Sequence, residues 1–379
     1  MAKKRKRKLK FRRIVLLMIF ITIVILLFLA VKNNKSNSYE KKNHEKNVIE
    51  KENELSLIMV GDSLIHSSVY DDAYEDGIYN FDKMLSLISP IVKNYDLAFY
   101  NQETILGGTD IGLSSYPSFN SPQEVGDAFI NAGFNLVSLA NNHTLDRGSE
   151  AVISSNNYWK NQRDVLTSGS RNSRKDRNNI EIKEKNGIKY TLLAYTTTTN
   201  GIRSENDYYV NVYDEKQVKE DIERVRDKVD LLLVSMHWGE EYSFEITEEQ
   251  EKIANYLASL GVDIVIGHHP HVIEPIDYVD DTLIIYSLGN FLSGQEGLER
   301  RIGLMVSVNI EKNNGDLMIS KPTATLTYTN YNDGNVKSNF KVYPFNKVTD
   351  SILPGYRSYY DEYMDIITSR SGKVIKSPI

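Results

Sequence analysis

The chain has 379 residues, and its 45 Lys and Arg against 51 Asp and Glu give a formal net charge of −6. The charge is unevenly spread: residues 1–13 contain nine basic and no acidic residues, which leaves 36 basic against 51 acidic residues in the remainder. An acidic body excludes nucleic acid as its main partner, and an apolar content of 41% excludes disorder over most of the chain. The absence of cysteine excludes disulfides, thiolate metal sites and cysteine nucleophiles.

Residues 14–31 read IVLLMIFITIVILLFLAV, with Thr22 as the only polar side chain. As a helix this segment would span about 27 Å, close to the roughly 30 Å of a bilayer's hydrocarbon core. A cleaved signal peptide is the alternative, but its apolar region is usually shorter and is followed by a clearer cleavage site. The pattern therefore predicts a single-pass transmembrane helix in the cell membrane. The basic head, 1–13, is expected in the cytoplasm and the acidic body outside the cell.

Residues 32–54 are rich in Lys, Asn, Glu and Ser and contain too few apolar side chains to fold, so we expect a polar linker. No second linker of this kind interrupts residues 55–345, which we interpret as one large extracellular α/β domain. Residues 346–379 have no clear pattern and are treated as a C-terminal extension.

In the first half of the domain, the pattern of apolar residues predicts short buried strands that alternate with helices. The predicted strands are 55–60, 97–100, 134–139, 180–183 and 188–195, the last two joined by a hairpin turn at Asn186-Gly187. The predicted helices are 81–93, a helix opened by Ser121 as N-cap and ended near Gly133, and 150–162.

In the second half, the alternation of helices and strands continues at first and is then followed by strands alone. A charged helix at 215–228 precedes a strand at 230–235, and a helix at 247–260, capped by Thr247, precedes a strand at 264–266. The segments 273–279, 283–287, 304–310 and 317–320 then resemble a run of antiparallel strands.

Polar side chains follow each of the core strands. They are Asp62 and His66, the run Asn101 to Glu103, the run Asn141 to His143, His237, and the run His268 to His271, and they include six of the seven histidines. Because α/β proteins bind ligands beyond the carboxyl ends of their strands, we expect these turns to converge at one edge of the sheet. Singly, each turn has a structural alternative: a Gly-Asp turn, a helix cap at Asn-Asn-His, or a buried histidine at His237. Together they predict a polynuclear metal site.

The predicted ligands are oxygens and imidazoles without thiolates, a set that suits Mn, Fe, Zn or Co. His269 and His271 are alternate residues, so on an extended segment they would face one centre. Two metal ions about 3.5–4 Å apart can bind a phosphoryl oxygen and lower the pKa of a bridging water. We therefore expect two divalent transition-metal ions, Mn, Fe or Zn.

The order of these turns, GD…NQE…NNH…HWG…HHPH, followed by SLGNF at 287–291, resembles the CapA family over roughly residues 55–295. These are bacterial capsule and poly-γ-glutamate synthesis proteins, related to calcineurin-like metallophosphoesterases. The resemblance implies a four-layer αββα sandwich after the transmembrane helix. It also implies a part in the synthesis, release or export of poly-γ-glutamate or a similar anionic surface polymer, alongside membrane subunits for capsule synthesis or export.

The resemblance further implies a role for each residue of the turns. Asp62 would bind the first metal, Glu103 would bridge, Asn142 and His237 would bind the second, and His269 and His271 would divide between the two. His268 would flank the site without ligating. A Glu at the bridge replaces the Asp of the broader superfamily, which alters the expected metal spacing.

Beside these ligands, His143 would hydrogen-bond the substrate or protonate its leaving group. Asp146 could orient His143 or form a surface ion pair with its neighbour, and Asn290 could line the site or form a turn. The superfamily expects a histidine two residues after the first Asp, where this sequence has Leu64. His66 could substitute for that histidine or simply pack on a helix.

Three functions remain open from the sequence. The first is the membrane-anchored capsule protein described above. The second is a stand-alone cell-surface phosphoesterase or amide hydrolase that depends on metal. The third is a polymer-binding scaffold without catalysis, which Leu64 favours over the hydrolase.

Overall fold

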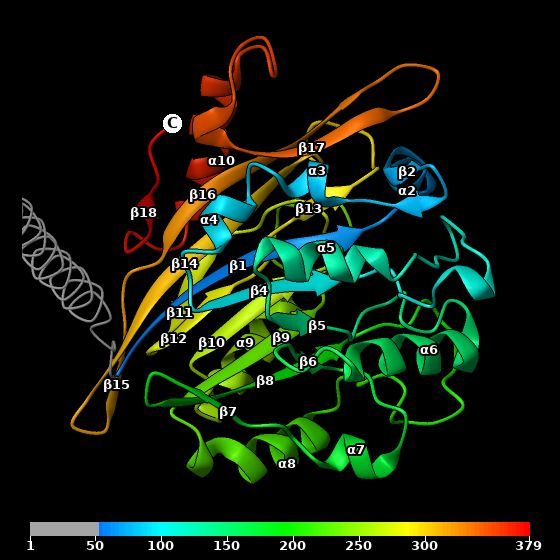
Figure 1. The fold of residues 1–379 in the computed structure, drawn as a ribbon. Coiled ribbons are helices and arrows are strands. Elements are labelled where there is room, and N and C mark those ends of the chain that lie inside the picture. Colours follow the sequence, from blue (N-terminus) through cyan, green and yellow to red (C-terminus); the bar gives the residue numbers. More distant parts are fainter. Residues whose placement is uncertain (1–52) are drawn as a thin grey trace, which may run out of the picture. The chain divides into compact units, whose positions relative to one another are not determined.

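Two β-sheets face each other in the described part of the chain, which is residues 53–379 of this computed structural model (Figure 1). The first sheet is mixed and runs in the order β17 (Ser338–Pro344), β16 (Thr323–Asn332), β14 (Ile302–Asn313), β1 (Glu54–Leu64), β4 (Leu97–Gln102), β5 (Leu136–Ser138) and β6 (Leu166–Ser168). Short strands β13 (Asn290–Ser293), β15 (Asp316–Ile319) and β18 (Ile375–Lys376) pair with β1, β14 and β16.

The second sheet runs in the order β11 (Ile276–Val279), β12 (Thr282–Ile285), β10 (Ile264–His268), β9 (Leu231–His237), β8 (Ile188–Thr196) and β7 (Lys183–Lys185). Its central strands β8, β9, β10 and β12 are parallel, as are β1, β4, β5 and β6 of the first sheet. The carboxyl ends of these strands supply the turns in which the sequence places its polar residues.

Strand β1 shows why the core strands have continuous apolar sequences. Leu55, Leu57 and Met59 belong to the hydrophobic core between the two sheets, whereas Ile58 and Val60 pack with the helices on the outer face. Because side chains alternate along a strand, a strand that is buried on both faces needs apolar residues at every position.

Helices cover the outer face of each sheet, which gives four layers. Helices α2 (Ser67–Ala73), α3 (Asp82–Leu85), α4 (Ser89–Val92) and α5 (Glu124–Ala132) pack on the first sheet, and α8 (Glu215–Val225) and α9 (Glu248–Ser259) on the second. Helix α6 (Gly148–Lys160), α7 (Arg174–Asn178) and a small hairpin of β2 (Tyr74–Glu75) and β3 (Ile78–Tyr79) complete this part. The predicted α/β class is confirmed.

Several elements differ from the sequence prediction. Ser121 is not an N-cap, because α5 begins at Glu124 and the Ser121 hydroxyl instead donates to Thr104 Oγ1 (2.8 Å). The helix predicted at 81–93 is two short helices, with Pro90 near the start of the second. The expected antiparallel run is divided between the sheets: β11 and β12 belong to the second, β14 and β15 to the first, and β12 pairs in parallel with β10.

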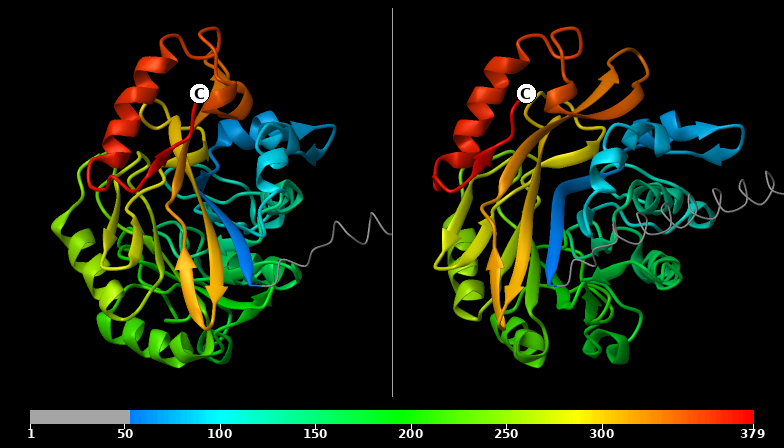
Figure 2. Two further views of the ribbon diagram at one scale, coloured as in Figure 1. Left: turned by 90° about the vertical axis from the view of Figure 1, so that its left-hand side faces the viewer. Right: turned by 60° about the vertical axis from the view of Figure 1, so that its left-hand side comes forward.

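The C-terminal residues form structure that the sequence did not predict. Helix α10 (Tyr356–Thr368) buries Tyr363, Met364 and Ile367 in the same core cluster as the residues between the sheets. Strand β18 then pairs in parallel with β16. Figure 2 shows α10 (red) at one end of the domain, away from α8 (green).

The predicted head, 1–13, the predicted membrane helix, 14–31, and the predicted linker, 32–54, apart from its last two residues, lie outside the described residues. Within residues 53–379, none of the helices has the length and apolar character needed to cross a membrane.

Candidate metal centre

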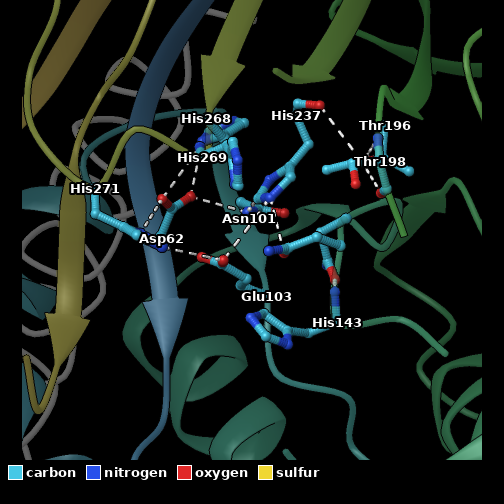
Figure 3. A network of polar contacts seen from close by, with 12 residues as sticks. Asp62, Asn101, Glu103, His143, Thr196, Thr198, His237, His268, His269 and His271 are labelled. Carbon is cyan, nitrogen blue, oxygen red and sulfur yellow. Dashed lines mark hydrogen bonds and ion pairs between the residues drawn. The ribbon is translucent and has the colours of Figure 1, made fainter. Parts of the chain in front are cut away.

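The polar turns of both sheets meet at one place, shown in Figure 3. Asp62 lies in β1, Glu103 directly follows β4, and His237 and His268 end β9 and β10. The sequence predicted a single sheet edge, but the residues come from two facing sheets. We call the six predicted ligands Asp62, Glu103, Asn142, His237, His269 and His271 the carboxylate–histidine cluster.

Two glycines allow the strands that carry these residues to approach closely. Gly61 precedes Asp62 and Gly267 precedes His268. A Cβ atom at either glycine would overlap a backbone carbonyl oxygen of the neighbouring strand or turn, that of Gly289 or Tyr286. Only glycine fits at such close backbone contacts, which explains this residue type directly before two polar side chains of the site.

Asp62 is fully buried and surrounded by hydrogen-bond donors. Its Oδ1 accepts from Asn101 Nδ2 (2.9 Å), and its Oδ2 lies 3.3 Å from His271 Nδ1 and 3.4 Å from the backbone nitrogen of His269. Burial alone would raise the pKa of Asp62, but the imidazoles of His268 and His271 hold it well below its usual value. The carboxylate is therefore ready to bind a cation at neutral pH.

Glu103 lies at the centre of the cluster. Its Oε1 is 3.8 Å from His237 Nε2 and 3.6 Å from His271 Nε2. Neither carboxylate oxygen has a hydrogen-bond partner among residues 53–379, although the side chain is fully buried. Burial, and next the charge of Asp62, raise the pKa of Glu103 well above its usual value. A buried carboxylate without partners is costly unless a cation sits beside it.

His237, Asn142 and His269 gather on one side of Glu103. His237 Nε2 lies 3.0 Å from Asn142 Oδ1, and the His237 and His269 rings are 4.6 Å apart. Burial lowers the pKa of His237 well below its usual value, and burial together with His271 lowers that of His269 to about 4. Both rings are thus neutral at pH 7, the form that binds metal.

His271 lies on the other side, between Asp62 and Glu103. Asn290 of β13 accepts from His271 Nδ1 (3.1 Å), which leaves Nε2 directed at Glu103. Asn290 is in turn held through Nδ2 by Gln295 Oε1 (2.8 Å) and the Arg300 carbonyl (2.9 Å). Asn290 therefore fixes the orientation of a predicted ligand, as partners behind metal-binding histidines commonly do.

The backbone of the His269–His271 segment is unusual. His269 has φ 101° and His271 has φ 60°, both in the left-handed region that residues other than glycine rarely adopt. The expectation of an extended segment was therefore wrong, yet the two rings are only 6.0 Å apart. Such strained conformations cost free energy and concentrate at functional sites.

His143 stands beside the cluster with Asp146 behind it. Its Nδ1 donates to Asp146 Oδ2 (2.7 Å), and this carboxylate also accepts from the backbone N–H of Phe119 (2.7 Å). Arg147 bonds Ser114 Oγ (2.6 Å) and loop carbonyls instead. Of the alternatives for Asp146, the structure shows the one in which it orients His143.

His66 lies outside the cluster. Its Nδ1 lies 3.0 Å from the Leu64 carbonyl oxygen and 3.3 Å from the backbone nitrogen of Gly294, and burial lowers its pKa to about 4. Its ring packs edge-on against Phe119, 5.1 Å away, and the same phenylalanine packs on His143 at 4.7 Å. Among the hydrogen bonds and ion pairs of residues 53–379, none joins His66 to the cluster carboxylates, so these contacts favour the alternative in which His66 packs.

Two residues of the polar turns contact Asp62 although the sequence analysis gave them no ligand role. Asn101 bonds Asp62 and lies 3.5 Å from His237 Nδ1. His268, expected only to flank the site, is fully buried with Nδ1 3.3 Å from Asp62 Oδ1. The signal for Asn101 was its position opposite Asp62 in the parallel pairing of β1 and β4, which the sequence alone does not fix.

The residues present fit the binding of metal. One oxygen of Glu103 and one nitrogen each of His269 and His271 all lie within 4.8 Å of one another. The Glu103 oxygens and His269 Nδ1 lack hydrogen-bond partners in the described part of the chain. Unpaired buried atoms of this kind, all oxygen or imidazole nitrogen, are groups that a bound metal ion would satisfy.

The sequence pattern of the family described as bacterial capsule synthesis protein PGA_cap matches residues 56–295. The chain belongs to this family. Every residue of the carboxylate–histidine cluster, together with His143, Asp146 and Asn290, lies inside the matched PGA_cap segment.

Among relatives, the chain is 28% identical over 276 residues to the capsule biosynthesis protein CapA of Bacillus anthracis, covering 69% of this chain and 66% of that protein. It is 30% identical over 183 residues to the PGA biosynthesis protein CapA of Bacillus subtilis (strain 168), covering 48% of each. The match thus spans just under two thirds of the first relative and about half of the second.

Among solved structures, the calcineurin-like phosphoesterase YfkN from Bacillus subtilis aligns with a TM-score of 0.46 and 14% identity, covering 82% of this chain and 99% of that one. This likeness is too distant to inform the chemistry of the PGA_cap site.

Proposed function

We propose that this PGA_cap protein takes part in the synthesis, release or export of poly-γ-glutamate or a similar anionic surface polymer, through a two-metal site held by the carboxylate–histidine cluster. Family membership supports the polymer role. The observation that carries the metal site is Glu103, whose two buried oxygens have no hydrogen-bond partner within residues 53–379 while two imidazoles face it.

In this proposal Asp62 and His271 would hold the first ion, Asn142, His237 and His269 would hold the second, and Glu103 would be a ligand available to both. When bound, the ions would supply positive charge for an anionic group and lower the pKa of a water. That local charge would offset the acidity of the body, which otherwise repels a polyanion.

The proposed setting is the outer face of the cell membrane. The apolar segment 14–31 behind a basic head supports a single-pass anchor with a cytoplasmic N-terminus. We propose membrane subunits of capsule synthesis or export as partners, since an anchored domain meets them without diffusing through the medium.

The first test is the metal content of fragment 53–379 purified without chelator. We expect close to two transition-metal ions per chain, lost in the His269→Ala/His271→Ala variant. His66→Gln is the matched control, because His66 is a partly buried histidine that packs on Phe119 outside the cluster, and the variant should retain both ions. If a folded fragment takes up no Mn or Zn, the proposed metal site is wrong. The polymer-binding scaffold without catalysis is then the function that remains.

The second test addresses the polymer. The full chain with His269→Ala/His271→Ala, expressed in place of the native protein in its own host, should lower the amount of surface polymer, whereas His66→Gln should not. Unchanged polymer in the cluster variant would contradict the proposed role even if metal binds.

A hydrolase acting alone is the second candidate, and the His143–Asp146 pair favours it. Asp146 holds Nδ1 of His143, so the other ring nitrogen is directed away from Asp146 and, when the ring is in its imidazolium form, can give a proton to a leaving group. The soluble fragment should then turn over phosphoesters or γ-glutamyl amides, with His143→Ala slower by about 10²–10⁴-fold. An assembly subunit would instead lose its function once it is detached from the membrane.

A further inference from the structure

His268 is a buried histidine that the proposed metal site does not use. It ends β10, directly opposite His237 in the parallel pairing of β9 and β10. Its ring stacks on Phe99 with centroids 5.4 Å apart and planes at 26°, and its side chain is fully buried. Packing explains the ring, but it does not explain why the ring is an imidazole.

The two nitrogens of His268 have no well-aligned hydrogen-bond partner among the described residues. An unsatisfied buried polar group destabilises a fold, so an apolar ring at this position would be more stable if packing were its only role. Its Nδ1 lies 3.3 Å from Asp62 Oδ1, a separation that a small rotation of either group converts into a hydrogen bond.

The donors around Asp62 fall into two groups. Oδ1 faces Asn101 Nδ2 (2.9 Å) and His268 Nδ1 (3.3 Å), neither of which belongs to the cluster. Oδ2 faces the His269–His271 segment. One carboxylate oxygen is thus turned toward residues that only hold it, and the other toward the proposed ligands, as Figure 3 shows.

We propose that His268, acting with Asn101, is a positioning residue that holds Oδ1 of Asp62 and so presents Oδ2 to the first metal ion. This inference rests on the proposed two-metal site. It also gives a reason for His268 in a chain with Leu64, since a site that lacks one ligand depends more strongly on the placement of the carboxylate that remains.

The test separates the hydrogen bond from the packing. His268→Phe keeps a flat ring on Phe99 but removes both nitrogens, whereas His268→Asn places an amide nitrogen near the position of Nδ1. Titration calorimetry of metal-free fragment 53–379 with Mn²⁺ gives the affinity of each site. We expect His268→Phe to weaken one of the two sites by about 10–100-fold, the usual effect of losing a partner behind a ligand. His268→Asn should restore most of this loss.

His66→Phe is the control, because His66 is also a histidine packed against a phenylalanine, although it is only partly buried, and the variant should leave both affinities unchanged. Should His268→Phe fail to fold by circular dichroism, His268→Gln replaces it, since its amide lies near Nε2 rather than Nδ1. The Asn variant must then bind Mn²⁺ more tightly than the Gln variant.

Two results would overturn the inference alone. Wild-type affinity at both sites in His268→Phe would show that the ring only packs. Equal weakening in His268→Phe and His268→Asn would show that the hydrogen bond to Asp62 is not the cause. A wild-type fragment that binds no Mn²⁺ is a different failure, because it overturns the proposed metal site and this inference together.

Discussion

At the scale of single residues, the position of His143 depends on Asp146. Asp146 Oδ2 accepts two hydrogen bonds of 2.7 Å, from the His143 ring and from the Phe119 backbone, and its side chain is 2% exposed. The same carboxylate therefore connects the candidate proton donor to the loop that carries Phe119. Because water cannot replace either bond, the carboxylate contributes to folding as well as to orientation.

Removing this carboxylate should destabilise the fold. Asp146→Ala leaves two buried N–H donors without an acceptor, at a cost of about 1–3 kcal/mol each. The stability of Asp146→Asn should lie between that of Asp146→Ala and that of the wild type. Urea denaturation of fragment 53–379 measures the free energy of unfolding. The control is Asp110→Ala, an exposed acid, which should change it by less than about 0.5 kcal/mol. Equal stability of the two Ala variants would contradict the role given to Asp146.

The residues that the sequence predicted for the site are those whose place depends only on the end of a strand. Glu103, His237 and Asn142 follow apolar runs that end clearly, and parallel strands bring such ends together. His268 was harder, because three histidines in four residues differ only in the direction of each side chain. That direction depends on the left-handed backbone at His269 and His271, which no sequence pattern indicates.

At the scale of elements, the N-terminus of helix α9 is hydrogen-bonded to Glu274, three residues after His271 of the cluster. Thr247 and Gln250 form the predicted capping box. The Gln250 amide also donates to Oε2 of Glu274 (2.7 Å), a fully buried carboxyl whose Oε1 has no partner among residues 53–379. Burial raises the pKa of Glu274 to about 8.

This shift predicts a pH-dependent contribution to stability. Between about pH 4.3 and 8, the unfolded chain has lost the Glu274 proton while the folded chain keeps it, so the stability contributed by this group falls as pH rises. Glu274→Gln removes the titration. The free energy of unfolding of Glu274→Gln minus that of the wild type should increase by about 1.4 kcal/mol for each unit that the pH rises inside this window.

Denaturation of both proteins from pH 5 to 8 measures the difference. Glu248→Gln, at an exposed position of the same helix, should give a difference that does not change with pH. A constant difference for Glu274→Gln as well would mean that the carboxyl is ionised in the folded protein throughout this range.

Local signals identified some elements and not others. The capping box of α9 and the Asn186-Gly187 hairpin were predicted because each depends on a few adjacent residues. The Ser-Pro-Gln-Glu run at 121–124 has the same kind of signal, but Ser121 bonds Thr104 instead. Which sheet a strand joins depends on contacts distant in sequence, so the strands after residue 273 could be found but not assigned.

At the scale of the whole domain, the site and the start of the described chain lie at opposite ends of β1. Asn53 donates its backbone N–H to the Asn186 carbonyl (2.7 Å), at the hairpin of β7 and β8. Asp62 follows nine residues later, roughly 30 Å along an extended strand. Fragment 53–379 therefore retains every residue of the proposed site.

The C-terminal end of the domain should be essential for folding. Tyr363, Met364 and Ile367 of α10 are at most 5% exposed and belong to the core cluster between the sheets. Burying a side chain of this size contributes about 1.5–3 kcal/mol, and a whole domain is stable by only about 5–15 kcal/mol. Fragment 53–348, which lacks α10, should therefore aggregate or unfold at a much lower temperature than fragment 53–379.

Thermal unfolding of a third fragment, 53–371, makes this comparison specific. It keeps α10 and loses β18, whose Ile375 is 49% exposed, so its midpoint should stay close to that of fragment 53–379. If fragment 53–348 instead unfolded at the temperature of fragment 53–379, the apolar face of α10 would add nothing to the core. Residues 349–379 would then be an extension resting on a domain that is complete without them.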